Sequence, residues 1–180
     1  MAIRHDVLES VGGFGALVSH LADDYELGLR THQAGYRVVL AGTVVDNHLP
    51  RYSLAGFWEH QLRWGRGIRD ARPAGYAAMI FTFGLFWSAL AVLFSQGASW
   101  AWSLFAVALA LRVVLALVAG VGVLGDRQVL RDLWLLPLRE LAAFAVWLVS
   151  LFGHTVTWRG ERFRLSKGRL FAIRPAERAR

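Results

Sequence analysis

The apolar and polar positions divide this chain into three regions. Residues 1–75 alternate short apolar stretches with charged and polar ones, as ordinary globular sequence does. Residues 76–153 are almost continuously apolar, and residues 154–180 are strongly basic. A uniformly water-soluble protein does not separate its residues in this way. We therefore expect a small globular part, a membrane region and a basic tail.

The first region predicts helices with clear ends. The expected helices cover residues 3–12, 24–34 and 54–69. Their apolar side chains recur at helical spacing. Gly12–Gly13 and Gly35 stop the first two helices, because glycine readily takes a left-handed cap. Ser53 can cap the start of the third helix, and Pro73 lies at or just beyond its end.

Two short strands are expected between the second and third helices. Residues 36–41 and 43–46 are β-branched and apolar. Such stretches favour strands. Together with the helices they indicate a small α/β part ahead of the membrane region.

The membrane region contains three apolar blocks. They cover residues 76–95, 99–124 and 133–153. The first two are long enough to span a bilayer, which takes about 20 residues. Pro137, Arg139 and Glu140 interrupt the third, so we expect an interfacial or re-entrant segment there. Arg112 lies in the middle of the second block, where a charge is costly, and we expect it to face a helix partner or a polar cavity.

The net charge of +7 is concentrated in the tail. Its eight basic residues against two acidic ones give a net charge of +6. The basic residues are Arg159, Arg162, Arg164, Lys167, Arg169, Arg174, Arg178 and Arg180. No nucleic-acid-binding motif accompanies this charge, so anionic lipid headgroups are the expected partner and nucleic acid is not. The absence of cysteine excludes disulfides and thiolate metal sites.

The distribution of arginine predicts an orientation in the membrane. Residues 51–72 carry five Arg, the 125–132 turn carries Arg127 and Arg131, and the 95–99 turn carries no basic residue. Basic segments remain on the cytoplasmic side of membranes. We therefore expect an integral membrane protein whose amino-terminal region and tail lie in the cytoplasm.

An acidic pair, Asp23 and Asp24, stands at the start of the second expected helix. Carboxylates at this position can cap the helix and complement its dipole. Alternatively, one of them acts as a general base that takes a proton from an acceptor hydroxyl. The second reading requires the pair to lie in a cleft beside a leaving-group site.

A basic and aromatic cluster lies on the third expected helix, and it too has two readings. It contains His60, Gln61, Arg63, Trp64 and Arg66. The helix can lie on a membrane surface with its aromatic side chains, Phe57, Trp58 and Trp64, towards lipid and with Arg63, Arg66 and Arg69 towards headgroups. Alternatively, arginine pairs with phosphate oxygens and tryptophan stacks on a sugar.

Four stretches carry a family resemblance. They are VLESVGGF, LADDYELGLRTHQAGYRV, HQLRW and GHTVTWRGERFRL. The chain resembles the carboxy-terminal half of a family 2 type glycosyltransferase domain, and within that group the ceramide glucosyltransferases and the glycosyltransferases of bacterial hopanoid biosynthesis. The resemblance implies an α/β remnant of a GT-A-type domain in residues 1–75, followed by membrane α-helices, so that the fold is mostly α overall. It also implies a bacterial inner membrane location.

The resemblance assigns roles to five residues. Asp24 takes the place of the general base of an inverting transfer, with Asp23 in support. Arg63 and Trp64 match the end of the (Q/R)xxRW motif, which serves donor diphosphate and acceptor binding. His60 falls on the first position of that motif, where the family has Gln or Arg.

The resemblance also implies partners: a UDP-sugar as hexose donor and a ceramide- or hopanoid-like lipid as acceptor. In the intact enzyme a divalent metal, Mg or Mn, binds at a DxD-type motif in an amino-terminal half. Residues 1–22 contain no such motif. We therefore expect an amino-terminally truncated module that is inactive without a donor-binding half. The alternatives are a non-catalytic membrane-anchored remnant or partner protein, and a fragment of a processive polysaccharide synthase.

Overall fold

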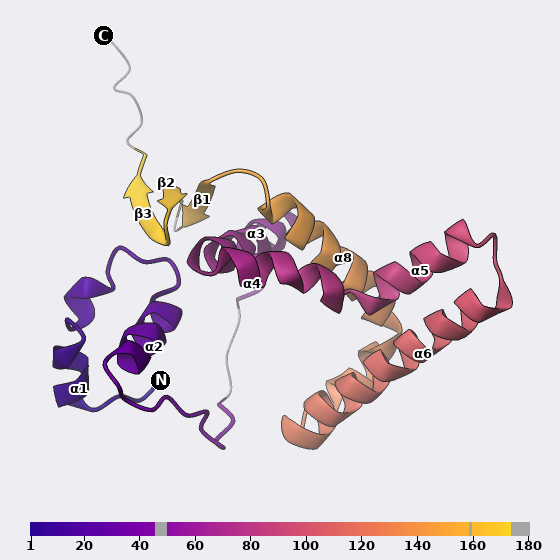
Figure 1. The fold of residues 1–180 in the computed structure, drawn as a ribbon, viewed down its shortest axis with the longest axis horizontal. Helices are drawn as coiled ribbons and strands as arrows, with labels where there is room; N and C mark the ends of the chain where they lie inside the picture. Colours follow the sequence, from indigo (N-terminus) through magenta and orange to yellow (C-terminus); the bar gives the residue numbers. More distant parts are fainter. Residues whose placement is uncertain (46–49, 159, 174–180) are drawn as a thin grey trace, which may run out of the picture. The chain divides into compact units, whose positions relative to one another are not determined.

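The computed structural model describes residues 1–45, 50–158 and 160–173. The chain divides into two units, one formed by Met1–Ala77 with Val149–Arg180 and the other by Ala78–Leu148. Helices dominate, and a small antiparallel sheet accompanies them (Figure 1). The predicted fold class, an α/β remnant followed by apolar helices and mostly α overall, is confirmed.

The first unit contains the three expected helices, α1 (His5–Ser10), α2 (Asp23–Gln33) and α3 (Leu54–Ala71). A short 3-10 helix that was not predicted, η1 (Phe14–Ala16), lies between α1 and α2. Leu8, Leu17 and Leu27 form a buried cluster that joins α1 to α2. The Ser53 Oγ accepts a hydrogen bond from the Gly56 N–H at 3.1 Å, which confirms the predicted cap of α3. Gly35 has a φ of 86° just beyond α2, as expected for a left-handed stop.

The two strands expected before α3 are not formed. Residues 36–45 belong to no strand or helix, and their side chains are exposed. Asp46, the last residue of the second expected strand, lies outside the described residues. β-branched residues stabilise a strand only when a neighbouring strand and a buried face are available. Val38 and Val39 have neither, because both are exposed.

The carboxy-terminal stretch, expected only as a basic tail, forms the sheet instead. Its strands are β1 (Thr155–Trp158), β2 (Glu161–Ser166) and β3 (Arg169–Ala172), antiparallel in the order β1-β2-β3. Val156 and Leu165 are buried at 3% and 1% exposure. Lys167 and Gly168 join β2 to β3 with φ of 51° and 77°. This two-residue turn suits a hairpin. Arg159 and residues 174–180 lie outside the described part.

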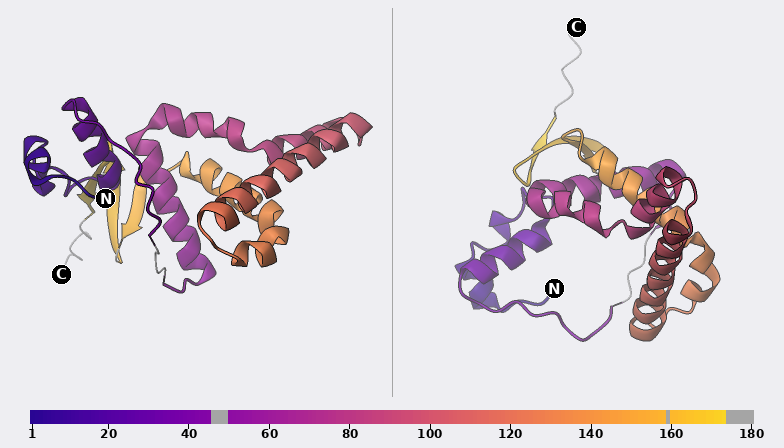
Figure 2. Two further views of the ribbon diagram at one scale, coloured as in Figure 1. Left: turned by 90° about the horizontal axis from the view of Figure 1, so that it is seen from below. Right: turned by 45° about the vertical axis from the view of Figure 1, so that its right-hand side comes forward.

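The sheet lies between the start of α2 and α3 within the first unit (Figure 2). β1 and β2 contact α3. On the other edge, the Leu170 N–H donates to the Ser19 carbonyl at 2.7 Å. The sheet therefore connects the segment that leads into α2 with the helix α3.

The remaining helices form the apolar part of the chain. They are α4 (Pro73–Ala78), η2 (Met79–Thr82), α5 (Gly84–Phe94), α6 (Ser99–Ala116), the π-helical η3 (Leu117–Val123), α7 (Gln128–Asp132), η4 (Leu133–Leu135) and α8 (Leu136–Ser150). Two continuous stretches, Ser99–Val123 and Gln128–Ser150, are long and apolar enough to cross a membrane. Pro73–Thr82 and Gly84–Phe94 would form a third only as a pair bent by 52°. The first apolar block, residues 76–95, is thus broken at Phe83, whereas most of the third, residues 133–153, belongs to the long helical stretch Gln128–Ser150.

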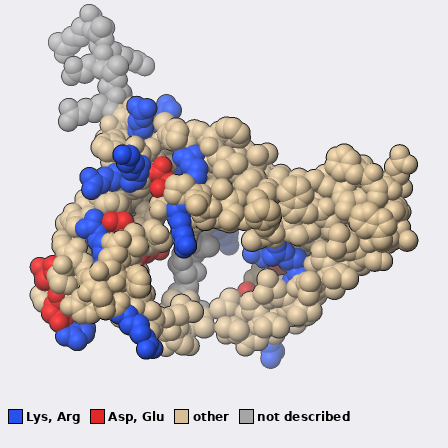
Figure 3. All heavy atoms as spheres, viewed as in Figure 1, with Lys and Arg blue, Asp and Glu red and all other residues tan. Residues whose placement is uncertain are grey.

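Charged side chains are distributed unevenly between the globular and the apolar parts of the chain. Residues 73–111 contain no Asp, Glu, Lys or Arg. Lys and Arg gather over the first unit in the view of Figure 3, whereas α5 presents none. Only 6% of the most apolar stretch within Ser99–Val123 is buried. Side chains so exposed and so apolar suit contact with lipid, which supports membrane association.

The expectation that Arg112 meets a helix partner is confirmed. Its Nη2 lies 3.1 Å from the Glu140 Oε2 on α8 and donates to the Thr82 carbonyl at 2.5 Å. Glu140 interrupts the third apolar block in the sequence, and the structure makes it the counter-ion of the charge in the second. A paired charge is far less costly in apolar surroundings than an isolated one.

Candidate functional site

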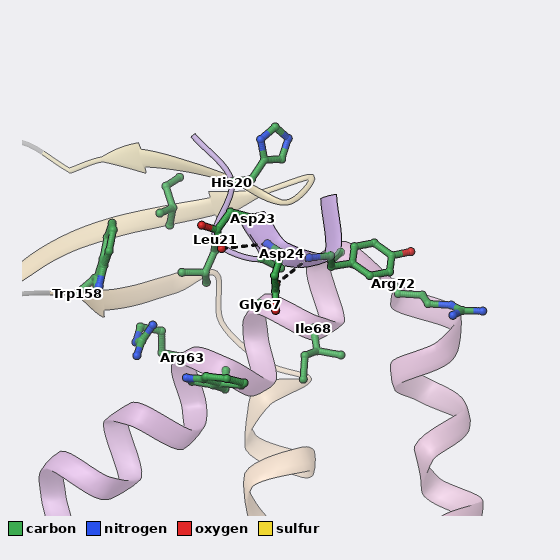
Figure 4. A pocket seen from close by; sticks show the side chains of 14 residues that line it. His20, Leu21, Asp23, Asp24, Arg63, Gly67, Ile68, Arg72 and Trp158 are labelled. Carbon is green, nitrogen blue, oxygen red and sulfur yellow. Dashed lines mark hydrogen bonds between the residues drawn. The ribbon is translucent and has the colours of Figure 1, made fainter. Parts of the chain in front are cut away.

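A cleft of about 630 Å³ lies in the first unit between the start of α2, α3 and the sheet (Figure 4). Asp23, Asp24, Arg63 and Trp64 all line it. The other lining residues are His20, Leu21, Ala22, Tyr25, Gly67, Ile68, Ala71, Arg72, Trp158 and Leu170. Four of the five residues singled out from the sequence therefore share one cavity, although about forty positions separate the acidic pair from the arginine and tryptophan.

The acidic pair is exposed at the first turn of α2. The Asp23 Oδ1 accepts the Asp24 N–H at 3.0 Å, and the Asp24 Oδ1 accepts the Tyr25 N–H at 2.7 Å. Both carboxylates thus satisfy first-turn N–H groups, as the capping reading expects, and the helix dipole favours their negative charge. The pair also lies at the wall of a cleft, which is one of the two conditions of the general-base reading; the other, a leaving-group site beside it, stays a prediction.

The segment just before the acidic pair is held by the sheet. The Leu21 N–H donates to the Gly168 carbonyl at 3.2 Å, and His20 pairs with Arg169 as an isolated antiparallel bridge. Ser19–Leu21 therefore adds to the free edge of β3 and enters α2 from a fixed position. The carboxy-terminal sheet therefore sets the position of the two carboxylates.

Two arginines of α3 hold the other edge of the sheet. Arg66 donates from Nη1 to the Thr155 carbonyl at 2.6 Å. Arg69 donates from Nη1 to the carbonyls of Ser150 and Gly153 at 2.5 and 2.9 Å. Burial and the neighbouring Arg69 lower the pKa of Arg66. The hypothesis that these two arginines face lipid headgroups is wrong, because they bind backbone carbonyls of their own chain.

A glycine in α3 permits the close approach of the acidic segment. A Cβ on Gly67 would lie 3.1 Å from the Leu21 Cδ2, which is tighter than ordinary contact. Glycine in a helix costs about 0.5–1 kcal/mol relative to alanine. Glycine at this position is explained by the close contact between α3 and Leu21, which leaves too little room for a Cβ.

His60 lies outside the lining of the cleft and contacts Arg63 instead. Its Nδ1 is 3.1 Å from the Arg63 Nη2 and 3.4 Å from the Tyr52 hydroxyl. Burial, and then the charge of Arg63, lower the pKa of His60. The neutral imidazole is favoured, and its Nδ1 can accept a hydrogen bond from Arg63.

Sequence reasoning missed the contribution of the tail to the cleft. Trp158 of β1 and Leu170 of β3 both line it, as does Arg72 just after α3. The signal was present, because TVTW and ERFRLS alternate in polarity and a Lys167–Gly168 pair joins the second of these to the next strand. The high positive charge of the tail favours an interpretation as a lipid-binding segment, which is why the hairpin was not predicted.

The described residues do not form a metal site by themselves. Among them, no group of three or more His, Cys, Asp or Glu is placed to hold a metal ion. Asp23 and Asp24 form an acidic pair without a third ligand of these types. The divalent metal expected from the resemblance stays a prediction, since Mg²⁺ is usually held by one or two carboxylates together with substrate phosphates.

Comparison with known proteins identifies the family. The model of glycosyl transferase family 21 matches residues 1–171. The chain belongs to glycosyl transferase family 21. This is a ceramide glucosyltransferase-like family, so the resemblance seen in the sequence is confirmed at the level of a glycosyltransferase of that group. The comparisons with curated proteins and with solved structures found no significant match.

Proposed function

We propose that this chain carries the acceptor and leaving-group side of an inverting glycosyltransferase, which transfers a hexose from a UDP-sugar to a lipid hydroxyl. The observation that carries the proposal is the single cleft lined by Asp23, Asp24, Arg63 and Trp64. Membership of family 21 supports a sugar donor and an acceptor. The candidate membrane helices support a lipid acceptor, and the resemblance suggests a ceramide- or hopanoid-like alcohol.

In the proposed reaction, the Asp24 carboxylate accepts the proton of the lipid hydroxyl. The hydroxyl oxygen attacks the anomeric carbon while the bond from that carbon to the diphosphate breaks, and the electron pair leaves with UDP. Attack opposite the leaving group inverts the anomeric configuration. Arg63 stabilises the charge that develops on the diphosphate, and Asp23 supports Asp24. Trp64 provides an apolar wall for the acceptor.

His60 acts through Arg63 in this proposal. Its contact with the Arg63 guanidinium supports an orienting role, since a neutral Nδ1 that accepts a hydrogen bond restricts the rotamer of the arginine. The family resemblance had suggested a direct role with the donor diphosphate. The position of His60 outside the cleft lining favours the indirect one.

The donor half of the site is proposed to lie elsewhere than in these 180 residues. The sequence contains no DxD motif, and no step above passes through a metal. The metal and the UDP moiety would bind to a donor-binding half, so we expect the 180-residue chain alone not to transfer sugar. Its proposed location is a bacterial inner membrane, with the cleft and the basic tail on the cytoplasmic side, as the arginine distribution suggests.

The test measures transfer from UDP-glucose to ceramide in proteoliposomes. Two proteins are compared: the chain alone, and the chain joined in frame to the donor-binding half of a family 21 glycosyltransferase. The joined protein should form glycosylated lipid of inverted anomeric configuration, and the chain alone should form none. If the joined protein gives no product with a panel of UDP-hexoses and lipid alcohols, while an unmodified family member does, the chain is a non-catalytic membrane protein.

A further inference from the structure

A chain of hydrogen bonds connects α3 to the segment that carries the acidic pair. The Asp70 Oδ2, near the end of α3, accepts the N–H of Gly168 in the turn between β2 and β3. The carbonyl of the same Gly168 accepts the Leu21 N–H at 3.2 Å. Leu21 precedes Asp23 by two positions. One turn residue, bonded through both of its peptide groups, thus links the helix that carries Arg63 to the entrance of α2.

We propose that Asp70 is a positioning residue of the transfer site, which sets the placement of the acidic pair relative to Arg63 by holding Gly168 to α3. The proposal rests on the proposed function, because the distance between the acidic pair and Arg63 matters for catalysis only if the cleft transfers sugar. Asp70 itself does not line the cleft. It acts on the reacting groups through Gly168 and Leu21.

The position of Asp70 distinguishes it from the two arginines of the same helix. Arg66 and Arg69 bind carbonyls at β1 and in the stretch that leads into it, which is the far edge of the sheet from Ser19–Leu21. Within the described part of the chain, Asp70 is the α3 side chain that bonds to the β2–β3 turn. The edge that supports the acidic segment is therefore tied to α3 by a carboxylate.

The chemistry of this bond suits a fixed connection. A hydrogen bond from an N–H to an ionised carboxylate is stronger than one to a neutral acceptor. Gly168 and Asp70 are both part-buried, so removal of the carboxylate would leave the Gly168 N–H without an equally strong acceptor. A misplacement of about 1 Å in a reacting group can reduce the rate by about a hundredfold.

Three variants separate this role from a general effect on folding. Asp70→Ala removes the acceptor, and Asp70→Asn keeps an acceptor oxygen without the charge. Glu59→Gln, at an exposed position of α3, is the matched control for loss of one negative charge. The first measurement is amide hydrogen exchange on the full chain in detergent, which needs no catalytic activity.

In Asp70→Ala, exchange at Leu21 and at residues 166–170 should become about tenfold faster, while α6 remains unchanged. Asp70→Asn should restore part of the protection, and Glu59→Gln should match the wild type. Faster exchange at Gly168 with unchanged exchange at Leu21 would overturn the proposed connection. Faster exchange throughout the chain would also overturn it, since it would show a general loss of stability.

The second measurement is the rate of sugar transfer by the joined protein. Asp70→Ala should lower kcat by about tenfold to a hundredfold with the KM for the UDP-sugar unchanged, and Asp70→Asn should recover part of the loss. If the wild-type joined protein is active, an unchanged kcat in Asp70→Ala would overturn the positioning role. If the wild-type joined protein transfers no sugar, the proposed function fails and the positioning role fails with it, while hydrogen exchange still decides whether Asp70 holds Leu21 in place.

Discussion

Three arginines at three-residue spacing on α3 have different tasks, and each task follows from what the guanidinium contacts. Arg63 lines the cleft, whereas Arg66 and Arg69 bind backbone carbonyls of residues 150–155. Local sequence predicted that all three share a polar helix face, which is what their spacing implies. It could not separate the two roles, because the partners lie more than 80 positions away.

His60 gives the stability of the folded protein a predictable pH dependence. The folded protein holds the pKa of His60 below its ordinary value of 6.5. Between those two values the unfolded chain binds more protons than the folded one, so stability rises with pH in that window and is lost as the pH falls through it. We expect the midpoint of thermal unfolding to decrease from about pH 7 to about pH 5, in part because of this residue.

The variant His60→Gln tests this contribution. Glutamine can still accept from Arg63 but does not titrate, so the decrease in the unfolding midpoint at acidic pH should become smaller. Equal pH profiles for wild type and His60→Gln would contradict the assignment.

At the scale of elements, α3 is the support on which the cleft is built, and its glycines allow other segments to approach. A Cβ on Gly65 would lie 2.5 Å from the Ser150 Oγ and 3.0 Å from the Tyr76 hydroxyl. We expect Gly65→Ala to destabilise the protein by about 1–3 kcal/mol, because the buried neighbours must shift. Thermal or denaturant unfolding measures the change.

Gly28→Ala is the matched control for this substitution. Gly28 lies inside α2, and a Cβ there would meet nothing within 4 Å. Alanine should stabilise that helix by about 0.5–1 kcal/mol relative to glycine. If both variants unfold at the same midpoint, close packing against Gly65 is not a constraint.

The elements that could be predicted from the sequence are those whose signals are local. Helices α1, α2 and α3 were predicted from apolar spacing, from the glycines after α1 and α2 and from the Ser53 cap. The strands expected over 36–46 failed, because residues 36–45 have no partner strand. The sheet of the tail was missed although its alternation is regular. A strand depends on a neighbour that can be far along the chain, whereas a helix satisfies its own backbone.

At the scale of the whole molecule, an ion pair joins two helices in the apolar part of the chain. The Arg112–Glu140 contact joins α6 to α8 at 3.1 Å. Glu140→Gln should destabilise this part by about 3 kcal/mol, since it leaves the arginine without a counter-ion in apolar surroundings. Unfolding in mixed detergent micelles, monitored by helical circular dichroism, measures the loss.

Two further variants make the result interpretable. Arg139→Gln removes an exposed charge beside Glu140 and should change stability by about 0.5 kcal/mol or less. The double variant Arg112→Leu with Glu140→Leu should recover much of the loss, because it leaves no unpaired charge. A Glu140→Gln variant as stable as Arg139→Gln would show that the ion pair does not contribute to the stability of this part of the chain.

The placement of the chemical groups was only partly predictable from sequence. The acidic pair and the arginine–tryptophan pair were found from residue types and from resemblance, and the structure places both in one cleft. Their connection through Ser19–Leu21, β3 and Asp70 was not predictable, because it depends on pairings across more than 90 positions. The carboxy-terminal sheet is thus part of the site as well as part of the fold.

The most direct test of the proposed function is the rate of sugar transfer by Asp24→Asn in the joined protein, with Asp23→Asn beside it. Asparagine keeps the size of the side chain and can accept the Tyr25 N–H, but it cannot take a proton from the acceptor. We expect Asp24→Asn to lose about a thousandfold in kcat, and Asp23→Asn to lose about tenfold or less. Both should insert into membranes like the wild type. Transfer by Asp24→Asn at the wild-type rate would contradict the role of Asp24 as the general base.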